Sequence, residues 1–109
     1  KNCRMVAKYP VVNIVHQFAE AVRNQGVPLK EVYLFGSYAR GEQHDLSDID
    51  VALVSDDFMG VSFEDVKRFI DVTIQKPYMY FEIHTYNTAD FEDTNPLAHE
   101  IIKTGIKVI

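Results

Sequence analysis

The sequence predicts a single domain of the α/β class, in the broad α+β sense, in which helices and strands alternate along the chain. Apolar residues recur at helical spacing in some segments, and other short segments rich in Val, Ile, Tyr and Phe follow the two-residue repeat of strands. Gly, Pro or polar residues separate these segments. No repeat, low-complexity stretch or internal linker divides the chain, so we expect one domain over residues 1–109.

The first half of the chain is expected to form a helix followed by two strands. The helix should span about residues 9–24 and end at the Gly-Val-Pro turn of residues 26–28. Its apolar face consists of Ile14, Val15, Phe18, Ala19 and Val22. Strands are expected over residues 30–35 and 48–54, each with side chains alternating between two faces.

The second half is expected to continue the alternation. Residues 62–65 resemble a capping box, because an acid lies three residues after Ser62. The helix that follows should end near Lys76-Pro77, and its apolar face consists of Val66, Phe69, Ile70 and Ile74. Residues 78–86 alternate as a strand. A last helix over residues 96–104 should lead into a short strand over residues 106–109.

A candidate phosphate-binding turn follows the first strand, at Gly36 and Ser37. Gly36 permits backbone torsions and a close approach that a side chain would block, and Ser37 is suited to cap a short helix. Free N–H groups and the positive end of the helix dipole would then face an anion. Arg40 adds a positive charge one turn later, although it is as well placed to pair with Glu42 or Asp45. Taken alone, the turn more often indicates an ordinary strand-to-helix connection, which is common in α/β proteins.

Two aspartates, Asp48 and Asp50, flank one isoleucine at the head of the second strand. Since strand side chains alternate faces, both carboxylates are expected on one side, where they repel each other unless a cation lies between them. Mg²⁺ prefers oxygen ligands of this kind and commonly takes one or two carboxylates together with substrate phosphates. The alternative is a solvated turn in which Asp48 serves as a cap. The neighbouring Gly-Ser turn favours the metal site.

Gly36-Ser37, ten intervening residues and then Asp48-Ile49-Asp50 resemble the signature of the DNA polymerase beta-type nucleotidyltransferase superfamily. The short chain and the string Gly-Ser-Tyr-Ala-Arg-Gly look most like its minimal nucleotidyltransferase (MNT) proteins, many of which are antitoxins encoded beside a HEPN-domain toxin. The resemblance is tight over residues 34–54 and looser across the rest of the chain. It implies a polymerase beta-like palm, which is a small mixed sheet with helices packed mainly on one face.

The resemblance also implies a reaction. A nucleoside monophosphate, expected to be AMP, would pass from ATP or another nucleoside triphosphate to a hydroxyl acceptor, and pyrophosphate would leave. Gly36, Ser37 and Arg40 would bind the nucleotide through its phosphates.

Three carboxylates would carry the chemistry in this family. By resemblance, Asp48 and Asp50 would hold two Mg²⁺ ions, and Glu82 would be the third catalytic carboxylate, as metal ligand or general base. Glu82 departs from the family pattern, which more often has Asp there. The alternatives are that Glu82 faces solvent or that Asp71 takes the third position. His84, on the predicted face of Glu82, would orient it or a substrate, or would be an ordinary exposed strand residue.

The acceptor is expected to come from a partner protein, because the chain has little beyond a palm-like core. In the antitoxin branch of the family, the implied acceptor is a tyrosine hydroxyl of the HEPN toxin, which is adenylylated and thereby silenced. Two alternatives stay open. One is a non-catalytic antitoxin module that binds a nucleotide or a partner. The other is a small-molecule nucleotidyltransferase, which usually needs an added helical domain.

Composition narrows the possible partners and compartment. The formal net charge of −5 argues against direct nucleic-acid binding, which rewards clustered Lys and Arg. No apolar stretch approaches the ~20 residues that span a bilayer, and no secretory signal pattern is visible. The single Cys3 cannot form an internal disulfide. We therefore expect a cytoplasmic protein that does not bind membranes.

Overall fold

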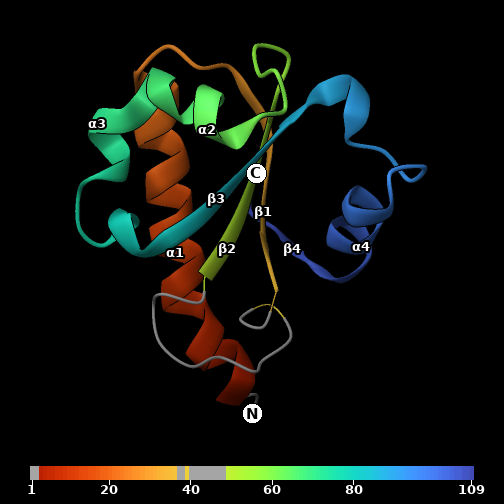
Figure 1. The fold of residues 1–109 in the computed structure, drawn as a ribbon. Helices are drawn as coiled ribbons and strands as arrows, with labels where there is room; N and C mark the ends of the chain where they lie inside the picture. Colours follow the sequence, from red (N-terminus) through yellow and green to blue (C-terminus); the bar gives the residue numbers. More distant parts are fainter. Residues whose placement is uncertain (1–2, 37–38, 40–48) are drawn as a thin grey trace.

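A computed structural model describes residues 3–36, 39 and 49–109. Within them, four strands form one sheet in the order β3-β2-β1-β4 (Figure 1). The strands are β1 (Leu29–Phe35), β2 (Ile49–Ser55), β3 (Phe81–Asn87) and β4 (Ile106–Lys107). β1 is antiparallel to both of its neighbours, β2 and β4, whereas β2 and β3 are parallel. The sheet is therefore mixed, as the resemblance implied.

The connection between β2 and β3 crosses over one face of the sheet, because parallel strands cannot be joined by a tight turn. It contains α2 (Ser62–Asp65), η2 (Val66–Phe69), α3 (Ile70–Thr73) and η3 (Tyr78–Tyr80). The continuous helix predicted here was wrong, since the segment breaks into short α-helical and 3₁₀ turns. Phe69 leaves helical torsions, with φ −139° and ψ 34°, and its ring is buried in the core. The strand predicted from residue 78 begins only at Phe81.

The capping box predicted at Ser62 was also wrong. The helix α2 begins at Ser62 itself, and no side chain caps it. The Ser62 hydroxyl instead accepts a hydrogen bond from the backbone N–H of Thr85, at 3.0 Å. The Asp65 carboxylate accepts hydrogen bonds from the backbone N–H groups of Met59 and Gly60. Both side chains therefore hold the crossover against the loop before it and against β3.

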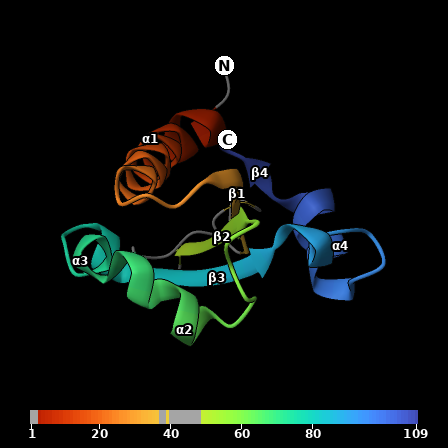
Figure 2. The same ribbon diagram turned by 90° about the horizontal axis from the view of Figure 1, so that it is seen from above.

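The main core lies on the face of the sheet that α1 (Cys3–Asn24) and the crossover cover (Figures 1 and 2). The helix α1 begins at Cys3 rather than near residue 9, and it contains Pro10. Its apolar face packs against alternate residues of the strands, as the predicted periodicities require. This core includes Val15, Phe18, Ala19 and Val22 of α1, Val32 and Leu34 of β1, Ile49, Val51 and Leu53 of β2, and Phe69, Val72 and Phe81.

The helix α4 (Pro96–Thr104) packs on the opposite face of the sheet (Figure 2) and matches its predicted bounds. Asn95 caps this helix by accepting hydrogen bonds from the backbone N–H groups of Leu97 and Ala98. The smaller core on this face consists of Tyr33, Ala52, Val54, Phe91, Ala98 and Ile101. No helix in the described part of the chain is long and apolar enough to cross a membrane.

Candidate functional site

Asp50 and Glu82 lie side by side near the beginning of two parallel strands. Asp50 is the second residue of β2, Glu82 is the second residue of β3, and the strand register pairs them directly. Paired residues of neighbouring strands project from the same face, so the two carboxylates point to one side of the sheet. The same face carries the smaller core, which includes Ala52, two residues after Asp50 on β2. The two carboxylates therefore lie next to one end of the smaller core.

His84 joins the two carboxylates. It lies two residues after Glu82 on β3, and its Nε2 is 3.3 Å from the Asp50 Oδ1. One ligand atom from each of Asp50, Glu82 and His84 can be chosen so that all three lie within 4.8 Å of one another. The sequence placed His84 on the face of Glu82, but its approach to Asp50 depends on the pairing of β2 with β3, which no local pattern reveals.

The environment of this cluster is partly open to solvent. The Asp50 and His84 side chains are 24% and 31% exposed, and Glu82 is exposed. The imidazole of His84 also packs edge-on against the ring of Phe35, with 5.0 Å between ring centroids and 64° between planes. The cluster is thus accessible to a ligand, and one of its three members is held by packing.

Gly36, the residue that follows β1, lies directly against the Asp50 side chain of the cluster. It has φ +79°, and a β-carbon built at this position would overlap the Asp50 carboxylate. Only glycine adopts these torsions without strain and also leaves room for the carboxylate. The close approach that the sequence predicted at Gly36 therefore exists, and its described neighbour is the Asp50 side chain.

The donor set of the cluster suits a divalent cation. Two carboxylates supply hard oxygen ligands of the kind that Mg²⁺ and Mn²⁺ take, and the imidazole adds a nitrogen. The three groups project from two adjacent strands of one sheet, so their backbone positions are fixed relative to one another. The residues present therefore fit a divalent metal ion.

The remaining predicted site residues fall into two groups. Ser37, Arg40 and Asp48 lie outside the described residues. Asp71, the alternative third carboxylate, is exposed on α3 and does not join the group of Asp50, Glu82 and His84. Among the described carboxylates, Glu82 is the one that pairs with Asp50.

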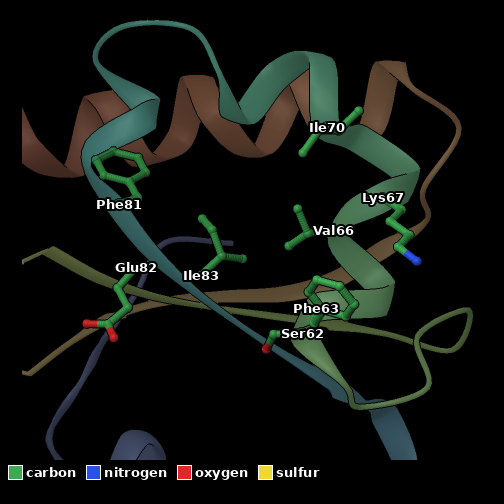
Figure 3. Close-up of a pocket in the computed structure, with 8 residues that line it drawn as sticks. All are labelled: Ser62, Phe63, Val66, Lys67, Ile70, Phe81, Glu82 and Ile83. Carbon is green, nitrogen blue, oxygen red and sulfur yellow. The ribbon is translucent and has the colours of Figure 1, made fainter.

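A groove of about 570 Å³ runs along β3 beside the cluster. Its walls come from α2, η2, α3 and the first residues of β3, and its lining is mostly apolar (Figure 3). The lining residues are Ser62, Phe63, Val66, Lys67, Ile70, Phe81, Glu82 and Ile83. Figure 3 shows the Glu82 carboxylate turned away from the apolar side chains, so this residue borders both the groove and the cluster.

Comparison with known proteins gives a family and two similar folds. A family model described as a nucleotidyltransferase domain matches residues 15–108. No curated protein sequence matches the chain. The structure resembles that of a candidate nucleotidyltransferase from Sulfolobus solfataricus, with a TM-score of 0.64 and 19% identity. That match covers 98% of this chain and 86% of the other.

A second similar structure is a crystal structure of a toxin–antitoxin with AMP-PNP. The TM-score is 0.58, the identity is 20%, and the match covers 86% of this chain and 72% of the other. At these identities the two structures support the mixed-sheet fold alone, and the evidence for the family of the chain is its match to the family model.

Proposed function

The chain belongs to the family of nucleotidyltransferase domains, and on this premise we propose that it transfers a nucleoside monophosphate from ATP or another nucleoside triphosphate to a hydroxyl group. The observation that carries the proposal is the pairing of Asp50 with Glu82 on adjacent strands, beside the turn at Gly36. The pairing brings two carboxylates together on a face partly open to solvent, which supports a site for a metal-bound triphosphate. AMP is the group that we expect to be transferred.

The proposed metal centre consists of Asp48, Asp50 and Glu82. A bound pair of Mg²⁺ ions would supply charge neutralisation for the triphosphate and would acidify the attacking hydroxyl. Asp50 would contribute from β2, and Asp48 would project to the same side by strand alternation. Glu82 would complete the set from β3. The paired backbones of β2 and β3 fix Asp50 and Glu82 relative to each other, so these two residues would need little backbone reorganisation when charge develops.

The nucleotide would bind across the end of β1. We propose that Gly36 and Ser37 hold its phosphates through backbone N–H groups and the serine hydroxyl, and that Arg40 offsets phosphate charge. The hydroxyl oxygen of the acceptor attacks the α-phosphorus and forms a new O–P bond. The bond from the α-phosphorus to its bridging oxygen breaks, and the electron pair leaves with pyrophosphate. The hydroxyl proton passes to a base, for which Glu82 is our candidate.

We propose that the acceptor is a tyrosine hydroxyl on a partner protein, specifically a HEPN-domain toxin, which makes this chain an antitoxin that acts by adenylylation in the cytoplasm. The similarity to a chain of a toxin–antitoxin structure supports a protein partner. The groove supports the same view, because it is apolar and borders Glu82. A segment of the partner that packs into the groove would bring a neighbouring hydroxyl to the metal centre.

The decisive experiment measures transfer of label from α-³²P-ATP, with Mg²⁺, into proteins co-expressed with this chain or present in the lysate of its host. Three variants accompany the wild-type protein: Asp48→Asn with Asp50→Asn, Glu82→Gln, and Asp56→Asn as a matched control. Asp56 is an exposed acid just beyond the other end of β2, where it pairs with Lys30. We expect a labelled band with the wild type and with Asp56→Asn, and none with the double variant.

The band also identifies the acceptor by mass spectrometry. A label on tyrosine of a HEPN protein supports the whole proposal, whereas a labelled small molecule would leave the nucleotidyl transfer standing and overturn the acceptor. If a partner co-purifies and is neutralised equally well by the double variant, and no label moves, the chain is a binding module and the proposed catalysis is wrong.

A further inference from the structure

His84 is the one member of the cluster whose chemistry the reaction described above does not use. Its Nε2 lies 3.3 Å from the Asp50 Oδ1, and it shares a strand face with Glu82. Edge-on packing against Phe35 fixes the direction in which the imidazole points. The His84 side chain is therefore directed toward Asp50 and does not extend freely into solvent.

Two interpretations account for the contact with Asp50. In the first, Nε2–H donates a hydrogen bond that holds the carboxylate. In the second, Nε2 carries a lone pair, and both atoms are ligands of one cation. The 3.3 Å separation is compatible with a long hydrogen bond, for which the usual N–H···O range is about 2.7–3.2 Å. It also agrees with the distance of about 3 Å between adjacent ligands that each lie about 2.1 Å from an ion.

The position of Glu82 favours the second interpretation. One ligand atom each of Asp50, Glu82 and His84 lies within 4.8 Å of the other two, so a ring nitrogen of His84 is near both carboxylates and not near Asp50 alone. In the described residues, no other histidine approaches a pair of carboxylates in this way: His99 contacts the single carboxylate of Asp93, at 3.7 Å, on the exposed side of α4.

We propose that His84 is a nitrogen ligand of the divalent metal ion held by Asp50 and Glu82. The proposal rests on the metal centre of the proposed function and adds to it a residue that the three-carboxylate arrangement does not include. An imidazole ligand suits first-row transition ions better than Mg²⁺, which binds oxygen almost exclusively. His84 therefore shifts the selectivity of the centre from Mg²⁺ toward Mn²⁺.

The test measures metal binding directly on the full chain, with Mn²⁺ as the probe. Electron paramagnetic resonance gives the free Mn²⁺ concentration and hence the Kd, and competition with Mg²⁺ gives the selectivity. We expect His84→Val to weaken Mn²⁺ binding by at least about tenfold, the lower end for loss of even an indirect partner of a metal site. Mg²⁺ binding should change much less, so the Mn²⁺ to Mg²⁺ selectivity falls. His99→Gln is the matched control and should leave both constants unchanged.

A spectroscopic signature separates a ligand from a residue that only orients Asp50. Electron spin echo envelope modulation of the bound Mn²⁺ should show a directly coordinated ¹⁴N in the wild type and in His99→Gln. The signal should vanish in His84→Val and in His84→Gln. The glutamine variant retains an N–H donor for Asp50, so recovery of Mn²⁺ affinity in that variant without a ¹⁴N signal would overturn the proposal in favour of a positioning role.

The possible failures are distinguishable. If Mn²⁺ binds to the wild type, depends on Asp50 and shows no coordinated ¹⁴N, His84 is not a ligand and the proposed function is unaffected. If the folded wild type binds no Mn²⁺, both proposals fail. Thermal unfolding of each variant without metal checks that it folds. If His84→Val does not fold, the wild-type signal and His84→Gln still decide the question.

Discussion

Gly36 approaches Asp50 so closely that the Asp50 carboxylate occupies the space where a side chain at position 36 would begin. Phe35 and Asp50 are register partners, so the end of β1 lies directly beside the start of β2 at the candidate centre. Gly36 belongs to the turn that the sequence proposed for phosphate binding, and Asp50 belongs to the proposed metal centre. A change at Gly36 should therefore alter the metal centre as well as the turn.

Gly36→Ala is expected to lower both stability and nucleotidyl transfer, and Gly26→Ala separates the causes. Gly26 has φ +93°, similar to the +79° of Gly36, but no heavy atom lies within 4 Å of a β-carbon built there. Both variants should lose more than about 1 kcal/mol of unfolding free energy, because alanine is strained at positive φ. Only Gly36→Ala should also displace Asp50. Urea unfolding and the labelling assay measure the two effects, and equal activity in both variants would contradict the steric argument.

Asp65→Ala is expected to destabilise the fold by about 3 kcal/mol, since hydrogen bonds to a charged group contribute about 1.5–3 kcal/mol each and their loss leaves buried donors without partners. Asp65 is 2% exposed and accepts from the N–H groups of Met59 and Gly60, at 2.9 and 3.0 Å, and from the Thr85 hydroxyl, at 2.6 Å.

Glu64→Ala is the control for this substitution. Glu64 is the preceding acid in the same helix, and it forms an exposed ion pair with Lys67, worth under about 1 kcal/mol. Chemical denaturation of both variants measures the difference in unfolding free energy. Similar small losses would show that the Asp65 hydrogen bonds are replaced by water.

Substitutions in the groove are expected to weaken partner recognition. Ile70, which is 48% exposed, and Phe63, which is 76% exposed, both line the groove. Ile70→Ser should raise the KM for the protein acceptor about three- to tenfold. Full burial of such a side chain is worth about 1.5–3 kcal/mol, about half of this side chain is left to bury, and 1.4 kcal/mol is a factor of ten. Leu97, 49% exposed on α4, supplies the control Leu97→Ser. Equal KM values for the two variants would place the acceptor elsewhere.

Alkaline pH is expected to destabilise the protein through Tyr33 and Tyr86. Burial, and then the hydrogen bond and charge of Glu31, raise the pKa of Tyr33, and burial raises the pKa of Tyr86. The folded state thus favours the protonated phenols. Their stabilisation is fully present below the ordinary tyrosine pKa of about 10 and is lost as pH rises through the raised values.

The unfolding free energy should therefore fall above about pH 10, the tyrosine reference value. Tyr33→Phe should flatten this fall, and Tyr86→Phe should flatten it as well. Phenolate absorbance followed together with circular dichroism measures both ionisation and unfolding. A slope that is identical in all three proteins would exclude Tyr33 as a contributor.

Local patterns in the sequence were sufficient for most of the elements. The alternating residues of β1 and the apolar spacing in α1 are properties of short segments, so they can be read without knowing which elements these segments pack against. The crossover was predicted wrongly for the opposite reason. Ser62 and Asp65 form hydrogen bonds with Thr85 and with the loop at Met59, and these tertiary contacts displace the local capping pattern.

The sequence proposed residues for the candidate site but not the geometry that brings Asp50, Glu82 and His84 together. The Gly-Ser turn and the Asp-x-Asp spacing indicated a phosphate and metal site, and the face of β3 that carries Glu82 follows from alternation. The register of β2 against β3 is a long-range property. It decides that Asp50 stands opposite Glu82 and that His84 reaches the same carboxylate.

Among residues 3–36, 39 and 49–109, β3 is an edge strand that is hydrogen-bonded to β2 on one side only, and it carries two members of the candidate centre. Edge segments open locally at lower free energy than the middle of a sheet. Local unfolding of β3 would therefore separate Glu82 and His84 from Asp50 while β1 and β2 stay folded. A divalent ion that bridges Asp50 to Glu82 would cross-link β2 to β3 and so oppose this local unfolding. Hydrogen exchange of the β3 amides should then slow on metal binding, whereas exchange in the centre of β1 stays the same.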